Sequence, residues 1–262
     1  MRRHELNTDF DWKPTCGPYR VLTPDHARQY DEAGYFLLPD AFTVDEIRAV
    51  REAIDPLEEA YEAVLKEKHG GRQFINKADA ITFTVHLVAR SPALKAFSRH
   101  PVFRDLCHDI MGPGARLYWD QAVYKKPGNP EEFPWHQDNG YTFMTPQQYL
   151  TCWVALTDAT LENGCPWVAP GLHLHGTLAH EATKLGLQCV TDPPGPVAVP
   201  AKAGDIVVFS SLTPHRTGPN LTAETRRSYI LQYAPDGVIA VDPFSGETKL
   251  ANDPERQYYV DG

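Results

Sequence analysis

The stretch from residue 112 to residue 233 constrains the possible fold more than any other part of the sequence. Short runs of β-branched and aromatic residues alternate there with Pro, Gly and Asn. The runs cover residues 115–124, 149–156, 166–169, 197–199, 205–209 and 227–233. Many short strands at this spacing are typical of a β-sandwich or barrel. Asn163-Gly164 predicts a tight hairpin between two of them.

The first third of the sequence predicts helices instead. Thr23 is suited to begin one helix, and Gly34 is suited to end it. Thr43 and Glu46 form a capping-box pattern that opens a longer helix, expected to run to about residue 68.

A short apolar run at residues 35–38 predicts an intervening strand, and residues 91–110 predict a third helix. We therefore expect a single α+β domain over residues 1–262. Its parts would be a mainly helical region (1–113), a β-barrel core (114–236) and a C-terminal extension (237–262).

Composition excludes several classes of protein. The net charge of −9 without a basic cluster argues against a nucleic-acid partner. No apolar stretch is long enough to span a bilayer, and no apolar run follows the basic first residues, so we expect a cytoplasmic protein without membrane association. The five cysteines form no CxxC pair and predict neither a disulfide framework nor a thiolate zinc site.

Histidine and aspartate residues suggest a metal site. His136 and Asp138 are two positions apart in a possible strand, so their side chains share one face. His215, in a turn after the run at 205–209, is the best candidate for a third ligand. Two imidazoles and one carboxylate leave part of the metal open, which is the ligand set of non-haem Fe(II) oxygenases.

A competing histidine pair is present, because His173 and His175 are also two positions apart. No carboxylate accompanies them at matching spacing, and we interpret both as loop residues. An HxD pair by itself is a weak signal, so the order of several motifs has to support the metal site.

Several segments together resemble the phytanoyl-CoA dioxygenase family of Fe(II)/2-oxoglutarate-dependent oxygenases. The resembling segments are Lys126-Pro127-Gly128, Trp135-His136-Gln137-Asp138, Glu162-Asn163-Gly164-Cys165, Ala169-Pro170-Gly171-Leu172-His173 and Ala203-Gly204-Asp205, followed by Phe209, His215 and Asn220. Leu172 stands where the family usually has Ser. The match covers about residues 117–234, with a weaker match at 30–38.

The resemblance implies a fold and a chemistry. The fold would be a double-stranded β-helix, a jelly-roll or cupin-like core with the N-terminal helices packed against it. His136, Asp138 and His215 would be catalytic as the ligands of Fe(II), with 2-oxoglutarate and O₂ as cosubstrates. The expected reaction is hydroxylation of an unactivated C–H bond in a small metabolite or natural-product intermediate, with release of succinate and CO₂.

The resemblance also implies cosubstrate-binding residues. Arg226 follows His215 at the offset of the family's 2-oxoglutarate arginine, and Thr217 occupies a position usually held by Ser. Trp153 matches a tryptophan of the cosubstrate pocket, although an ordinary core aromatic explains it equally well. Asp120 and Tyr124 share one face of a strand, and family position suggests that this face looks into the barrel.

Arg226 and Arg227 compete for the role of 2-oxoglutarate anchor, since adjacent strand residues point to opposite faces. Alternation alone leaves the choice open. The strand face that carries Arg226 is the more polar one, and the offset of Arg226 from His215 matches the family. Both points favour Arg226 as the 2-oxoglutarate anchor.

The sequence constrains the prime substrate and the type of oxidation less than it constrains the metal site. Residues 72–83 and 141–148 are expected near the mouth of the site, and Tyr141 and Phe143 would suit an apolar substrate. No basic cluster marks a coenzyme A site, and Asp138 disfavours halogenation, which usually needs that carboxylate replaced. The alternative is a non-catalytic, cupin-like protein that binds a metal or small molecule; the sequence does not indicate an oligomeric state.

Overall fold

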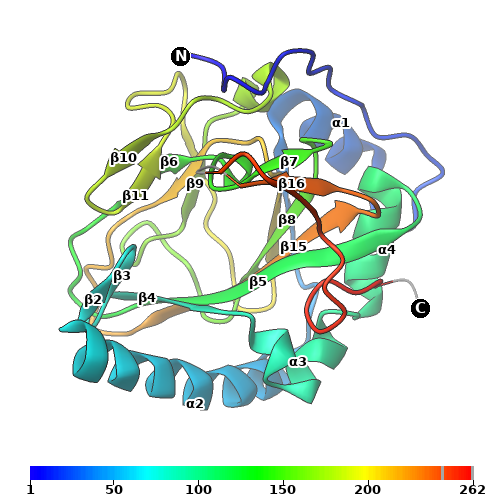
Figure 1. The fold of residues 1–262 in the computed structure, drawn as a ribbon. Coiled ribbons are helices and arrows are strands. Elements are labelled where there is room, and N and C mark those ends of the chain that lie inside the picture. Colours follow the sequence, from blue (N-terminus) through cyan, green and yellow to red (C-terminus); the bar gives the residue numbers. More distant parts are fainter. Residues whose placement is uncertain (243–244, 261–262) are drawn as a thin grey trace.

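Two antiparallel sheets form the centre of the protein in the computed structural model, which describes residues 1–242 and 245–260. Residues 243–244 and 261–262 of the expected C-terminal extension lie outside the described part. The large sheet has the strand order β1-β13-β8-β15-β5-β4-β3-β2, and the small sheet has the order β12-β9-β14-β6 (Figure 1). Strands β13, β8, β15 and β5 together with the small sheet form the expected double-stranded β-helix.

The strands of the large sheet are β1 (Tyr35–Leu38), β2 (Arg72–Gln73), β3 (Asn76–Lys77), β4 (Ile81–Val85), β5 (Ala115–Lys125), β8 (Leu150–Ala155), β13 (Ile206–Ser210) and β15 (Arg226–Pro235). The small sheet contains β6 (Phe133–His136), β9 (Pro166–Val168), β12 (Val197–Ala198) and β14 (His215–Thr217). Two further sheets join β10 (Glu181–Thr183) with β11 (Gly186–Gln188), and β7 (Phe143–Thr145) with β16 (Ile239–Val241) and β17 (Thr248–Leu250). The region expected to be mainly helical therefore also supplies four strands of the large sheet.

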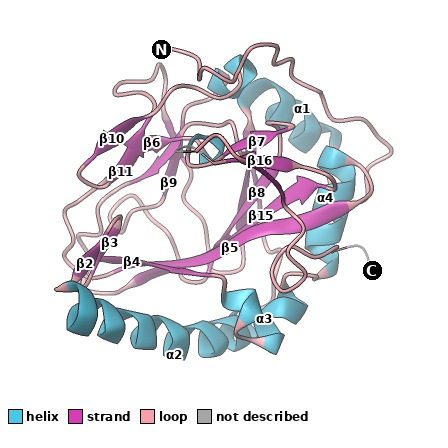
Figure 2. Cartoon of the chain, in the orientation of Figure 1, coloured by secondary structure: helices cyan, strands magenta, loops and turns pink. Residues whose placement is uncertain are grey.

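The helices cover one side of the large sheet (Figure 2). The covering helices are α1 (Pro24–Ala33), α2 (Val44–His69), α3 (Pro92–Phe97) and α4 (Pro101–Met111). Three short 3₁₀ helices, η1 (Leu87–Ala89), η2 (Asp138–Gly140) and η3 (Leu172–His175), lie in connections between other elements. None of the helices in the described residues is long and apolar enough to cross a bilayer.

Strand β15 shows how the two faces of the large sheet differ. Tyr229, Leu231 and Tyr233 belong to the core that packs against the helices. Ile230 belongs instead to the core between the two sheets. Because side chains alternate along a strand, the residues in phase with Ile230 face the interior of the barrel.

The predicted caps of the first two helices are confirmed. The Thr23 hydroxyl accepts from the backbone N–H of His26 at 3.1 Å. Thr43 and Glu46 form the complete capping box at the start of α2. Gly34 ends α1 with φ +82°, a left-handed conformation that favours glycine.

Two expectations for the fold were wrong. The single helix expected over 91–110 is two helices, α3 and α4, because Pro101 has no N–H to continue α3 and instead begins α4. Asn163-Gly164 does not join a hairpin: β8 pairs with β13 and β15, whereas β9 pairs with β12 and β14. This turn belongs to a connection between the two sheets.

Candidate functional site

Two neighbouring strands bring the predicted metal ligands together. His136 ends β6 and His215 begins β14, and the two residues pair directly in the small sheet. Their ring centroids are 4.1 Å apart. Asp138 follows at the start of η2, with Oδ1 3.7 Å from Nε2 of His215. Ligand atoms of all three residues lie within 4.8 Å of one another.

Backbone carbonyls fix how the two histidines present themselves. Nδ1 of His136 donates to the carbonyl of Pro134 at 2.8 Å, and Nδ1 of His215 donates to that of Thr213 at 3.0 Å. Each Nε2 therefore carries the lone pair that a metal needs. Burial lowers the pKa of His136 to about 3 and that of His215 to about 4, so both rings are neutral near pH 7.

The carboxylate of Asp138 is oriented by a residue that sequence reasoning missed. The Thr151 hydroxyl donates to Oδ2 at 2.6 Å, which leaves Oδ1 toward the histidines. Burial raises the pKa of Asp138. A buried carboxylate beside two neutral imidazoles fits a divalent cation, which would replace the lost hydration of the charge. A single Thr in a strand carries no sequence signal for this role.

Helix α1 supports the turn that carries His215. The Thr213 hydroxyl donates to the carbonyl of Gly34 at 2.7 Å. A Cβ on Gly34 would lie 2.4 Å from that hydroxyl oxygen and 2.7 Å from Nδ1 of His173. The glycine thus allows a close approach between the end of α1 and the ligand-bearing turn.

The rival histidines lie away from this cluster. His173 and His175 are in η3, and Nε2 of His173 contacts the carbonyl of Asp31 at 3.2 Å. Among the described residues, the cluster of His136, Asp138 and His215 is the one group suited to a metal.

A small cavity of about 50 Å³ extends from the metal ligands to Arg226. Arg226 is 1% exposed, and its Nη1 donates to the Ser228 hydroxyl at 2.7 Å. Its Nε and Nη2 are buried without a partner. Unpaired buried N–H groups of a cation are costly, and a carboxylate is the group that satisfies them best.

Two other predicted residues line the same cavity. The Trp153 ring lies under the guanidinium of Arg226, 5.3 Å from ring centroid to Cζ. Thr217 also lines the cavity, and its hydroxyl oxygen accepts from Nζ of Lys125 at 3.2 Å. The hydroxyl hydrogen of Thr217 therefore remains available for an anionic ligand. Lys125, a buried residue in the same strand as Asp120 and Tyr124, was not anticipated.

The predicted orientation of Asp120 and Tyr124 was wrong. Asp120 accepts from the backbone N–H of Leu87 at 2.8 Å and from the Tyr229 hydroxyl at 2.9 Å. Tyr124 donates to Asp55 on α2. Both side chains therefore lie on the helix side of the sheet, and Gln121 and Val123 line the cavity instead.

A larger cavity of about 390 Å³ adjoins the metal ligands on their other side. His136 and Asp138 line both cavities, as do Phe83, Gln121 and Phe133. Part of the predicted mouth is present in its wall, namely residues 74–76, Phe83, Tyr141 and Thr142. The two cavities therefore meet at the metal ligands.

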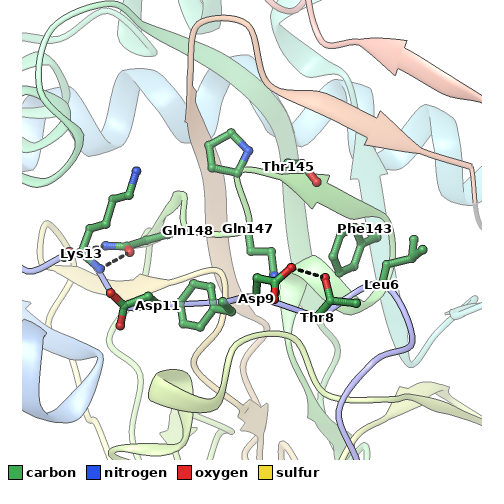
Figure 3. Close-up of a pocket in the computed structure, with 11 residues that line it drawn as sticks. Leu6, Thr8, Asp9, Asp11, Lys13, Phe143, Thr145, Gln147 and Gln148 are labelled. Atoms are coloured by element: carbon green, nitrogen blue, oxygen red, sulfur yellow. Dashed lines mark hydrogen bonds between the residues drawn. The ribbon is translucent and has the colours of Figure 1, made fainter.

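Phe143 lies elsewhere, in a cavity of about 280 Å³ beneath the N-terminal segment (Figure 3). Gln148 accepts from the backbone N–H of Lys13 at 3.1 Å and donates to its carbonyl at 2.9 Å. The polar groups here hold the N-terminal segment in place, and none of the metal-cluster residues lines this cavity.

Comparisons with known proteins agree with this geometry. The family model for phytanoyl-CoA dioxygenase matches residues 30–228. A phytanoyl-CoA dioxygenase from Arabidopsis thaliana is 25% identical over 249 residues, covering 80% of this chain and 88% of that protein. A methylphosphonate hydroxylase from Gimesia maris is 28% identical over 214 residues, covering 81% of each. The crystal structure of EctD from S. alaskensis with 2-oxoglutarate and 5-hydroxyectoine has the same fold, with a TM-score of 0.70 at 21% identity over 90% of this chain and 83% of that one.

Proposed function

The chain belongs to the phytanoyl-CoA dioxygenase family, and we propose that it is an Fe(II)- and 2-oxoglutarate-dependent dioxygenase whose iron is held by His136, Asp138 and His215. The observation that carries this proposal is the pairing of that triad with a buried, partly unpartnered arginine across one small cavity. A site that only bound a metal would have no need for such an arginine. The iron with 2-oxoglutarate supplies the O₂ chemistry, which ends in succinate, CO₂ and an oxidised C–H bond.

Arg226 and Thr217 would bind the distal carboxylate of 2-oxoglutarate. The unpartnered Nε and Nη2 of Arg226 can donate to its two oxygens, and the Thr217 hydroxyl can add a third bond. Trp153 would hold the guanidinium plane in place from below. The metal ligands, at the opposite end of the cavity, would then receive the 2-oxo acid end of the molecule.

The prime substrate would occupy the larger cavity of about 390 Å³, which has the size of a small-molecule site. Methylphosphonate and coenzyme A esters, named for two relatives, carry anionic groups. No Lys or Arg lines this cavity in the described residues, so we expect neither of them as the substrate. We propose instead that the substrate is a small metabolite or natural-product intermediate, and that the enzyme acts on it in the cytosol.

The proposal is tested by succinate release in the presence of Fe(II), ascorbate, O₂ and a metabolite library. Even without a prime substrate, we expect slow 2-oxoglutarate turnover that requires both iron and Arg226. A second measurement is anaerobic: Fe(II) and 2-oxoglutarate added together should give an absorption change that neither gives alone. Iron binding without any such change, and without succinate, would refute the oxygenase and favour a binding protein.

A further inference from the structure

The wall of the larger cavity is mostly aromatic and contains no Lys or Arg among the described residues. Its aromatic members include Phe74, Tyr118, Trp119, Phe133, Tyr141 and Tyr149. The polar members are amides and hydroxyls, such as Gln121 and Gln232. Among the described residues that line the wall, Asp138 is the one acidic side chain and His136 is the one histidine, and both are metal ligands of the proposed site.

The charges next to this cavity would already be matched in the loaded enzyme. The two positive charges of Fe(II) would be balanced by Asp138 and one carboxylate of 2-oxoglutarate, and Arg226 by the other carboxylate. Arg256 is paired with Asp253 at 2.8 Å and contacts His86, whose ring packs against Trp119. Neither an anionic nor a cationic substrate would therefore find an opposite charge in the wall, and burying an unpaired charge is costly.

A β-bulge aims two large rings into the cavity. Trp119 pairs with Gln232, whereas Leu117 pairs with Tyr233, so Tyr118 is an extra residue on β5. Neighbours in a regular strand point to opposite faces, but at this bulge both Tyr118 and Trp119 line the same cavity. The Tyr118 ring packs against Tyr149 with centroids 5.6 Å apart, which fixes its position.

We infer that the prime substrate is an uncharged compound with a flat, ring-containing body, and that Tyr118 and Trp119 determine specificity by contacting that body. This inference rests on the proposed function and narrows its substrate class. Aromatic side chains pack favourably against flat apolar groups, and the amides of the wall can form hydrogen bonds with neutral carbonyl or hydroxyl groups.

The test uses sets of probes that share one carbon skeleton and differ in the charge of the end group. One set is 4-phenylbutanamide, 4-phenylbutanoate and 4-phenylbutylamine, and matching amide, acid and amine sets are built on indole and on a fused three-ring skeleton. Stimulation of succinate release and quenching of tryptophan fluorescence are both measured with the intact enzyme. We expect the half-saturating concentrations of the neutral probes to be about tenfold lower than those of their charged counterparts.

A charge placed in the wall should reverse this preference. Val85 lies opposite Gln121 on β4 and lines the cavity, so Val85→Lys adds an ammonium group there. The ratio of half-saturating concentrations, acid over amide, should fall about tenfold in this variant. Val85→Gln is the matched control of similar length without the charge, and it should keep the ratio within about twofold.

A second pair of variants tests the Trp119 ring. Trp119→Ala should weaken binding of the neutral probes about tenfold, and Trp119→Phe should restore most of it. The inference would be overturned if acids or amines stimulated succinate release as much as the amides do, or more. It would also be overturned if none of the neutral probes stimulated succinate release or quenched the fluorescence. If the wild-type enzyme showed no slow turnover of 2-oxoglutarate without any probe, that different result would overturn the proposed function.

Discussion

Replacing Arg226 should strongly weaken the binding of 2-oxoglutarate, whereas replacing the adjacent Arg227 should hardly affect it. Arg226 is 1% exposed and lines the cavity at the metal ligands. Arg227 is half-buried on the other face, where its Nε lies 3.5 Å from Asp55 and its guanidinium stacks over Tyr124. Only Arg226 can therefore reach a ligand inside the barrel.

The expected change in the KM for 2-oxoglutarate follows from the hydrogen-bonded charge pair that is lost when Arg226 is replaced. Breaking a buried hydrogen-bonded charge pair costs about 2–5 kcal/mol, which corresponds to about 30-fold to a few thousand-fold in affinity. We expect Arg226→Ala to raise the KM for 2-oxoglutarate by a factor in this range. Arg227→Ala should change that KM less than about twofold and lower the free energy of unfolding by about 1 kcal/mol or less, since its ion pair is partly exposed.

Stability offers an independent check on the same residue. With Nε and Nη2 unpartnered, Arg226 is a buried charge whose desolvation is poorly compensated while no ligand is bound. Arg226→Met should therefore leave the ligand-free protein as stable as the wild type or more stable, although it cannot bind 2-oxoglutarate. Chemical denaturation without ligand measures this effect.

The assay is a 2-oxoglutarate titration, followed by succinate release and by the anaerobic absorption change. Arg226→Lys serves as the matched control, because it keeps the charge but loses the planar pair of donors; it should fall between wild type and Arg226→Ala. A large shift for Arg227→Ala with a small one for Arg226→Ala would refute the assignment.

The remaining predictions concern the metal and its support. His136→Ala, Asp138→Ala and His215→Ala should each abolish turnover and reduce bound iron while the far-ultraviolet circular dichroism stays unchanged; normal iron content in any one of them would remove that residue from the site. Fe(II) should support turnover, whereas Co(II), Ni(II) and Zn(II) should inhibit it, and zinc-supported activity without O₂ would contradict oxygenase chemistry. Gly34→Ala should lower the free energy of unfolding by at least about 1–2 kcal/mol, measured by denaturant titration, because its φ is +82° and its Cβ would collide with the Thr213 hydroxyl.

Local signals in the sequence predicted much of the fold. The caps at Thr23 and Thr43 are short-range patterns of hydrogen bonding, and they appear in the structure as expected. The metal triad needed more, because His215 is far from His136 in the sequence. Its prediction depended on the order of several motifs, and the direct pairing of β6 with β14 is the physical reason that this order matters.

The support of the site was beyond sequence reasoning. Thr151 reaches Asp138 only because β8 lies beside the cavity, and Lys125 reaches Thr217 only across the barrel. Thr and Lys are common in strands and on surfaces, so neither residue type marks such a position. Contacts of this kind depend on tertiary packing, which one sequence does not specify locally.

Asp120 and Tyr124 share one face, as alternation predicts, but the resemblance assigned that face to the barrel, and in the structure it lies toward the helices. A bulge earlier in the strand sets which face this is. Ala115 and Leu117, before the bulge, and Tyr124, after it, all pack on the helix side of the sheet. The extra residue at Tyr118 shifts the alternation by one position, so odd-numbered residues face the helices before the bulge and even-numbered ones after it. Alternation counted along an unbroken strand cannot reveal this change. The bulge that puts Asp120 on the helix side also turns Trp119 toward the cavity, so it builds the wall from which the substrate class is inferred.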